Sequence, residues 1–133
     1  MIYIDTGALL ARYLARDQYH EVAIKFWDRI RRKKEPCFTS NFVLDETFTL
    51  LARRAGYPFA AERARRIYAS NYMTVLRPSG EDEIKALEYF EKFGEHRVSF
   101  TDCISFALMR RHKIRRVFTF DLHFRLAGFT CHP

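Results

Sequence analysis

Short apolar segments that alternate with amphipathic helical segments constrain this fold more than any other feature of the sequence. The predicted strands are residues 2–4, 37–39, 73–76, 117–120 and 129–131, and one or two helical stretches separate each from the next. Short apolar strands joined through helices are typical of parallel sheets that are buried on both faces. The sequence therefore predicts an α/β fold with three layers, α/β/α, around a central and mostly parallel sheet.

Helical segments fill the intervals between these strands. Ser40 and Asp17 are each placed to cap the helix that follows. Apolar side chains recur at helical spacing and indicate the buried faces, among them Val22, Ala23, Phe26, Trp27 and Ile30 in one helix and Ile84, Leu87, Phe90 and Phe93 in another. We expect helices at residues 7–14, 17–34, 41–54, 59–71, 81–93, 99–112 and 122–126.

The composition fits one globular domain that spans residues 1–133. Apolar residues make up 48% of the chain, enough for a dense core, and no apolar run approaches the roughly 20 residues that cross a bilayer. Asp5 lies where a signal peptide would need a basic region and then a long apolar stretch. The three cysteines lack a C-x-x-C spacing, which argues against disulfides and against a zinc ribbon. We therefore expect a cytoplasmic protein with reduced cysteines.

The charge balance favours a polyanionic partner. Lysine and arginine outnumber the acids 23 to 16, which gives a net charge of +7, and such a surplus favours nucleic acid or an acidic protein. The basic run at residues 31–34 has two interpretations. It is either a solvated helix end whose cations complement the helix dipole, or an RNA contact.

Four acids fall where the carboxyl edge of the sheet is expected. Asp5 and Asp121 each follow a predicted strand, Asp102 lies in the first turn of a helix, and Glu46 lies near an apolar helix face. No lysine or arginine occurs between residues 37 and 52 to pair with Glu46. Ligands of parallel sheets bind beyond the carboxyl ends of the strands, and a metal ion would supply the missing positive charge.

Each acid also has a purely structural interpretation. Asp102 could be the carboxylate of a capping box that begins at Ser99, and Asp121 could cap the helical turn behind it. Asp5 could form an ordinary turn, and Glu46 could be a solvated helix residue. Taken one at a time these alternatives stay open, and the joint placement of the four acids at one edge favours a shared site.

The ordered set of motifs resembles the PIN-domain endonucleases, and especially the VapC-type toxins of prokaryotic toxin–antitoxin pairs. The resemblance covers essentially the whole chain. The residues that carry it are Ile4-Asp5-Thr6, Asp17 with His20, Ser40 through Asp45-Glu46-Thr47, Ser99-Phe100-Thr101-Asp102-Cys103, Thr119-Phe120-Asp121-Leu122-His123-Phe124, and Leu126-Ala127-Gly128-Phe129.

The resemblance implies an endoribonuclease that hydrolyses RNA phosphodiester bonds with metal-activated water. It makes Asp5, Glu46, Asp102 and Asp121 the metal site for Mg²⁺ or Mn²⁺, with Asp5 and Asp102 as direct ligands and the other two direct or water-bridged. Thr6 and Thr119 would support that site with their hydroxyls.

The resemblance also implies partners, namely a homodimer and a cognate antitoxin whose tail lies across the acidic pocket. Aromatic side chains in excess of one small core agree with such interfaces. They are Phe26, Trp27, Tyr57, Phe59 and Tyr68.

Two other functions remain to be compared with this one. One is a non-catalytic, basic nucleic-acid-binding module, and the other is a PIN-like nuclease that processes RNA without an antitoxin. An aspartyl-phosphate hydrolase would need a D-x-D pair after its first strand, and a nucleotide triphosphatase would need a G-x-x-x-x-G-K-[ST] loop. The chain has neither.

The five histidines lack the spacing of metal ligands and are interpreted as surface or packing residues: His20, His96, His112, His123 and His132.

Overall fold

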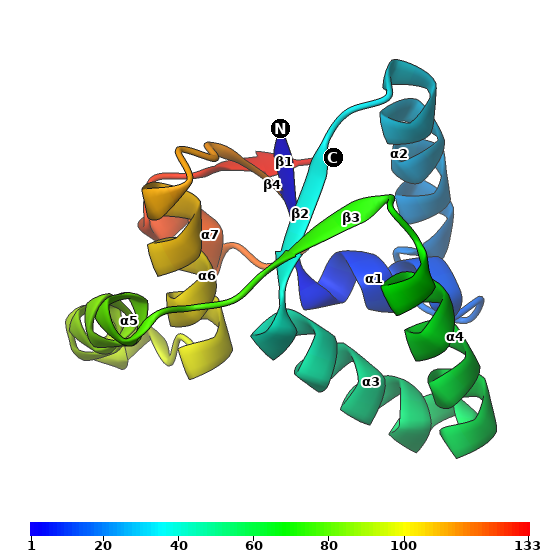
Figure 1. Ribbon diagram of the computed structural model, residues 1–133, viewed down its shortest axis with the longest axis horizontal. Helices are drawn as coiled ribbons and strands as arrows, with labels where there is room; N and C mark the ends of the chain where they lie inside the picture. The colour runs from blue at the N-terminus through cyan, green and yellow to red at the C-terminus, as the bar shows by residue number, and fades with distance from the viewer.

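A computed structural model describes all 133 residues, and its five strands form one sheet (Figure 1). The strands lie in the order β3-β2-β1-β4-β5, and every neighbouring pair runs parallel. The predicted parallel sheet is thus confirmed. The strands are β1 Ile2–Ile4, β2 Cys37–Ser40, β3 Met73–Leu76, β4 Arg116–Phe118 and β5 Thr130–His132.

Helices cover both faces of this sheet, which confirms the three-layer α/β/α architecture. Helices α1 to α4 lie on one side of the strands, and α5 to α7 lie on the other (Figure 1). None of them is both long enough and apolar enough to cross a membrane. The helices are α1 Thr6–Tyr13, α2 His20–Lys33, α3 Asn41–Ala55, α4 Tyr57–Ala69, α5 Gly80–Lys92, α6 Phe100–Arg111 and α7 His123–Leu126, and a 3₁₀ helix, η1 Gly94–His96, was not expected.

The direction in which the chain adds strands reverses at β1. From β1 the chain builds outward through β2 to β3, and it then returns to add β4 and β5 on the other side of β1. Tyr3 pairs with Val117, and Ile4 pairs with Phe118. The carboxyl ends of β1 and β4 therefore flank the switch point, where ligands of open parallel sheets bind.

Two predicted helix faces are partly wrong. In α2, Ala23, Phe26, Trp27 and Ile30 are buried as expected, but Val22 is exposed. In α5 the buried side chains include Asp82 and Ala86, whereas most of the predicted apolar stripe faces solvent. Because α5 packs chiefly on α6, at the outside of its layer, only a narrow strip of its surface is covered. The exposed members of that stripe are Ile84, Leu87 and Phe90.

The two predicted helix caps have different outcomes. Ser40 is the N-cap of α3, and its Oγ accepts the N–H of Val43 at 3.1 Å. The prediction for Asp17 is wrong, because α2 begins at His20 and Tyr19 occupies its N-cap position. Asp17 instead closes the preceding turn, where its Oδ1 accepts the N–H of Tyr19 at 2.8 Å.

The aromatic residues expected at interfaces divide into two groups. Phe26 and Trp27 belong to the buried core, and the Trp27 indole donates to the carbonyl of Ala8 at 3.2 Å. These two therefore say nothing about a partner. Tyr57 and Tyr68 are exposed on α4. The cysteines are all free, with Cys37 and Cys103 buried and Cys131 half-buried.

Candidate active site

A cavity of about 800 Å³ opens at the carboxyl edge of the sheet, beside the switch point. Asp5 reaches it from the end of β1, Glu46 from α3, Asp102 from the first turn of α6, and Asp121 from the loop after β4. The four acids expected at this edge are thus brought together by segments that are far apart in the sequence. None of the four carboxylates forms an ion pair with a lysine or an arginine.

Thr119 links the two acids that follow strands. β4 ends at Phe118, earlier than expected, and Thr119 turns its side chain toward β1. Its Oγ1 donates to Asp5 Oδ2 at 2.7 Å and accepts the N–H of Asp121 at 2.9 Å. Burial raises the pKa of Asp5 to about 6; the hydrogen bond from Thr119 opposes that rise, and the charges of Asp121 and Glu46 add to it.

Asp102 is not the carboxylate of a capping box. Ser99 does cap α6, and its Oγ accepts the N–H of Asp102 at 3.1 Å. The reciprocal hydrogen bond, from the Ser99 N–H to the Asp102 carboxylate, is absent. Burial first, and then the charges of Asp5, Asp121 and Glu46, raise the pKa of Asp102 to about 9. The side chain is therefore a buried acid without a lysine or arginine partner.

Asp82 shows what a buried carboxylate looks like when its role is structural. It is 4% exposed and Asp102 is 6% exposed, and each is the third residue of a helix that a serine caps. Asp82 completes a capping box with Ser79 and pairs with Arg111 at 2.8 Å. Burial opposes its ionisation, but the hydrogen bonds from Ser79 and Arg111 outweigh that effect and lower its pKa. The Asp102 carboxylate has neither a capping-box hydrogen bond from its serine nor an arginine partner.

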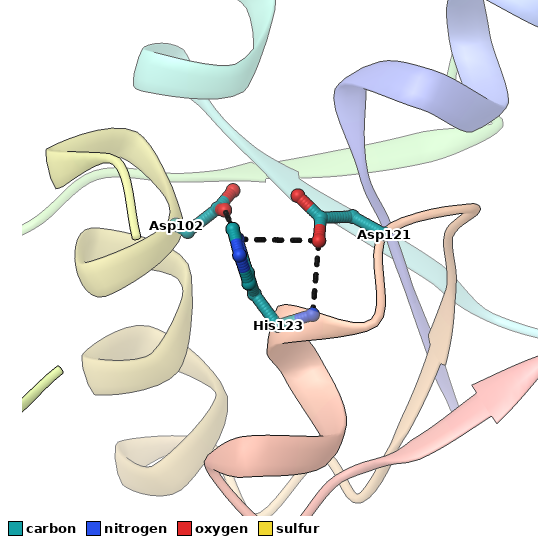
Figure 2. A group of neighbouring side chains, drawn as sticks. All are labelled: Asp102, Asp121 and His123. Atoms are coloured by element: carbon teal, nitrogen blue, oxygen red, sulfur yellow. Dashed lines mark hydrogen bonds and ion pairs between the residues drawn. The ribbon is translucent and has the colours of Figure 1, made fainter. Parts of the chain in front are cut away.

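His123 lies between two of the acids (Figure 2). Its Nδ1 is 3.2 Å from Asp121 Oδ1 and 3.6 Å from Asp102 Oδ2. Asp121 Oδ1 also accepts the backbone N–H of His123 at 2.9 Å. Leu122 occupies the N-cap position of α7, so the interpretation of Asp121 as the cap of that helix is wrong. The interpretation of His123 as a surface or packing residue missed this placement; the only signal in the sequence is its spacing of two residues from Asp121.

Thr6 and Glu46 also lack partners in the cavity. Thr6 is buried at the first position of α1, and its Oγ1 makes no hydrogen bond. Glu46 is half-buried, and it lines the same cavity as Arg54 and Arg97 without pairing with either. Neither arginine was singled out in the sequence, because neither belongs to a recognisable motif.

The basic run at residues 31–34 lies away from this cavity. It ends α2 just before β2 begins, which places it at the amino edge of the sheet, opposite the acids. Arg31 pairs with Asp28 on the same helix at 2.8 Å. The run is thus a solvated helix end, and the cations that line the cavity are Arg54 and Arg97.

The donor set fits a divalent cation. One ligand atom each from Asp102, Asp121 and His123 lie within 4.8 Å of one another, and the hydroxyl of Thr6 is unpaired beside them. Carboxylate oxygens are the ligands that Mg²⁺ and Mn²⁺ prefer. A cation would also relieve the repulsion among the uncompensated carboxylates.

The fold and the acidic site define a class of nuclease, and comparison with known proteins gives the same result. The sequence model of the PIN domain matches residues 2–129. The chain belongs to the PIN-domain family.

Within that family the relatives are VapC toxins. The 23S rRNA-specific endonuclease VapC20, from two strains of Mycobacterium tuberculosis, is 38% identical over 129 residues, which are 97% of this chain and 95% of that protein. A VapC ribonuclease of Archaeoglobus fulgidus is 32% identical, over 92% of this chain and 78% of its own. This chain is thus a VapC-type endoribonuclease toxin, a hydrolase, and the prediction of a ribonuclease rather than a non-catalytic binding module is confirmed.

Solved structures agree with this assignment. The crystal structure of M. tuberculosis VapC20, described as a Sarcin-Ricin loop cleaving toxin, superposes with a TM-score of 0.89 at 35% identity and covers 98% of this chain and 97% of its own. The VapBC2 structure of Rickettsia felis, bound to a DNA fragment from their promoter, gives a TM-score of 0.72. At 11% identity the second match supports the fold alone.

Proposed function

We propose that Asp5, Glu46, Asp102 and Asp121 hold Mg²⁺ or Mn²⁺ for the hydrolysis of RNA, within a single domain of residues 1–133. Asp5 and Asp102 are the direct ligands, and Glu46 and Asp121 bind directly or through water. The observation that carries this proposal is the contrast between Asp82 and Asp102. Two similarly buried carboxylates stand at equivalent helix positions, and only the one in the cavity lacks a lysine or arginine partner.

The chemistry that a bound cation supplies is the activation of water and the neutralisation of charge on the phosphate. The residues of the chain hold the geometry. Thr119 fixes one oxygen of Asp5 through its hydroxyl, and the N–H of His123 fixes one oxygen of Asp121. The hydroxyl of Thr6 remains free for a water or an RNA oxygen. Hydrolysis by water attack leaves a 5′-phosphate and a 3′-hydroxyl.

Ribosomal RNA is the substrate that we propose to test first. The relative with 38% identity is described as 23S rRNA-specific, and the match covers 97% of this chain and 95% of that protein. The net charge of +7 agrees with a large polyanionic substrate. We also propose that the protein acts in the cytoplasm, where a substrate of this kind is found.

A cognate antitoxin and a homodimer complete the proposed assembly. The support comes from apolar side chains that the fold leaves exposed, namely Ile84, Leu87 and Phe90 on α5 and Tyr57 and Tyr68 on α4. Light scattering of the purified toxin tests the dimer. A monomeric mass across the micromolar range would contradict it.

Cleavage-site mapping on total cellular RNA tests the proposed chemistry. We expect cuts in the presence of Mn²⁺ or Mg²⁺, none in EDTA, and recovery when the metal is added back. Asp102→Asn, which keeps the shape and removes the charge, should abolish cleavage. The matched control is Asp45→Asn, because Asp45 is exposed on α3 outside the cavity lining. Undiminished cleavage in EDTA would rule out the metal mechanism.

A further inference from the structure

Two aromatic rings form one wall of the acidic cavity. Tyr19 and Phe120 stack in parallel, with centroids 4.4 Å apart and planes 3° from each other, and both line the cavity with the four acids. Phe118 supports Phe120 through an edge contact at 5.9 Å. Phe120 is half-buried, whereas Tyr19 is 40% exposed. Tyr19 is therefore the accessible member of the stack.

The backbone holds both rings in a fixed relation to the acids. The N–H of Tyr19 donates to Asp17 at 2.8 Å, and its carbonyl accepts the N–H of Ala23 at 2.8 Å. Phe120 lies between Thr119, which bonds Asp5, and Asp121. An aromatic surface so placed has a constant position relative to any group bound at the carboxylates.

The cavity thus offers a different chemistry on each side. The carboxylates suit a cation, the unpaired guanidinium groups of Arg54 and Arg97 suit anions, and the Tyr19 ring suits a flat π system. A nucleotide carries both an anion, its phosphate, and a flat π system, its base. Aromatic side chains beside a cationic groove are the usual platform for unpaired bases.

We propose that Tyr19 stacks on a nucleobase next to the cleaved phosphate, with Phe120 as the positioning residue that holds the Tyr19 ring. The inference rests on the proposed hydrolysis of RNA at the four acids, and it names the contact that places the substrate there. Stacking accepts every base, so Tyr19 requires an unpaired nucleotide rather than a particular sequence.

Binding of RNA in EDTA tests the stack without any need for cleavage. The probe is a fluorescent RNA oligonucleotide with the sequence of the Sarcin-Ricin loop, which the relative VapC20 is described as cleaving, and anisotropy gives its Kd. Tyr19→Ala and Tyr19→Leu should weaken binding by about tenfold, and Tyr19→Phe should bind like the wild type. Tyr57→Ala is the matched control, because Tyr57 is 77% exposed on α4 and lies outside the cavity lining. Tyr19→Leu keeps an apolar side chain against Phe120, so it tests the loss of the ring even if the alanine variant is less stable.

An abasic nucleotide, placed at one position of the probe after another, identifies the base that stacks. It should weaken binding by the wild type as much as Tyr19→Ala does, and it should cost the Tyr19→Ala variant nothing more, because the two changes remove one contact. Additive losses, or an unchanged Kd for Tyr19→Ala and Tyr19→Leu, would overturn the proposed stacking. Failure of the metal-dependent cleavage would instead appear as intact Tyr19-dependent binding without cuts in Mn²⁺, so the two proposals fail separately.

Discussion

Identical local sequence patterns give Asp82 and Asp102 opposite environments. Each lies three residues after a capping serine, in the pattern Ser-x-x-Asp. The sequence could not separate them, because the pattern describes only the helix start. What separates them is where the start of each helix lies. α6 begins at the carboxyl edge of the sheet beside Asp5, whereas α5 begins where Arg111 can reach it.

Removal of the Asp102 carboxylate should leave the metal-free protein as stable as before, or more stable. The change relieves repulsion with Asp5 and Asp121, and the serine cap of α6 does not depend on it. Thermal melts of Asp102→Ala in EDTA should therefore match or exceed the wild type. The rise in Tm that Mn²⁺ gives the wild type through linkage should disappear. A variant that is weaker in EDTA and still gains stability from Mn²⁺ would restore the capping interpretation.

Asp82→Asn should behave in the opposite way. It breaks the pair with Arg111 and weakens the capping box of α5, a loss of about 1 kcal/mol for the cap alone. The Tm should fall equally in EDTA and in Mn²⁺, and the increment due to the metal should be kept. A selective loss of that increment would mean that Asp82 takes part in metal binding.

At the level of helices and strands, the sequence predicts the position of an element correctly where hydrophobic periodicity and turn chemistry agree. β1 and β3 lie at the predicted residues, and the cap at Ser40 marks the start of α3. Helix faces were less predictable, because burial depends on what packs against a helix. The apolar stripe of α5 has the spacing of a buried helix face, but α5 packs chiefly on α6, and most of the stripe is exposed.

The acids of the site were predictable as positions that follow strands, but their neighbours were not. His123, Arg54 and Arg97 reach the cavity from segments whose relative placement only the tertiary fold determines. Tyr19 was hidden for the same reason, since its partner Phe120 lies 101 residues later in the chain (120 minus 19). A sequence pattern over a few residues carries no information about contacts between residues that are far apart in the chain.

Neighbouring residues of α3 should respond differently to loss of charge. Glu46 lines the cavity, and Asp45 is exposed outside the cavity lining. Glu46→Gln should reduce cleavage by about tenfold or more in Mn²⁺ because it weakens the metal site, with little change in the EDTA melt. Asp45→Asn should alter neither. Equal effects in the two variants would show that general charge, and not the site, is being measured.

For the whole molecule, the raised pKa values of Asp5 and Asp102 predict how stability depends on pH. Between the ordinary carboxylate pKa of 3.8 and the raised values of about 6 and about 9, the folded protein binds more protons than the unfolded chain. The contribution of these two groups is therefore fully present below pH 3.8 and is lost as the pH rises through 6 and then 9.

The metal should reverse this trend, because it binds the ionised carboxylates. The difference between the Tm in Mg²⁺ and the Tm in EDTA should be small near pH 5 and grow toward pH 8. Asp102→Asn should remove most of the growth, and Asp45→Asn should leave it intact. A difference that is constant across this range would contradict the assignment of the two buried acids as ligands.

The reversal of strand order at β1 has a consequence for synthesis of the toxin on the ribosome. The first acid of the site is made almost at once, but the hydroxyl that fixes it lies 114 residues later. β1 lies between the two halves of the sheet, and the cavity at its carboxyl end forms only after β4 has been synthesised and has paired with it. A nascent chain that has not yet released residues 116–123 carries no assembled site. A ribosome that translates this protein is thus exposed to an active ribonuclease only after residues 116–123 have left it.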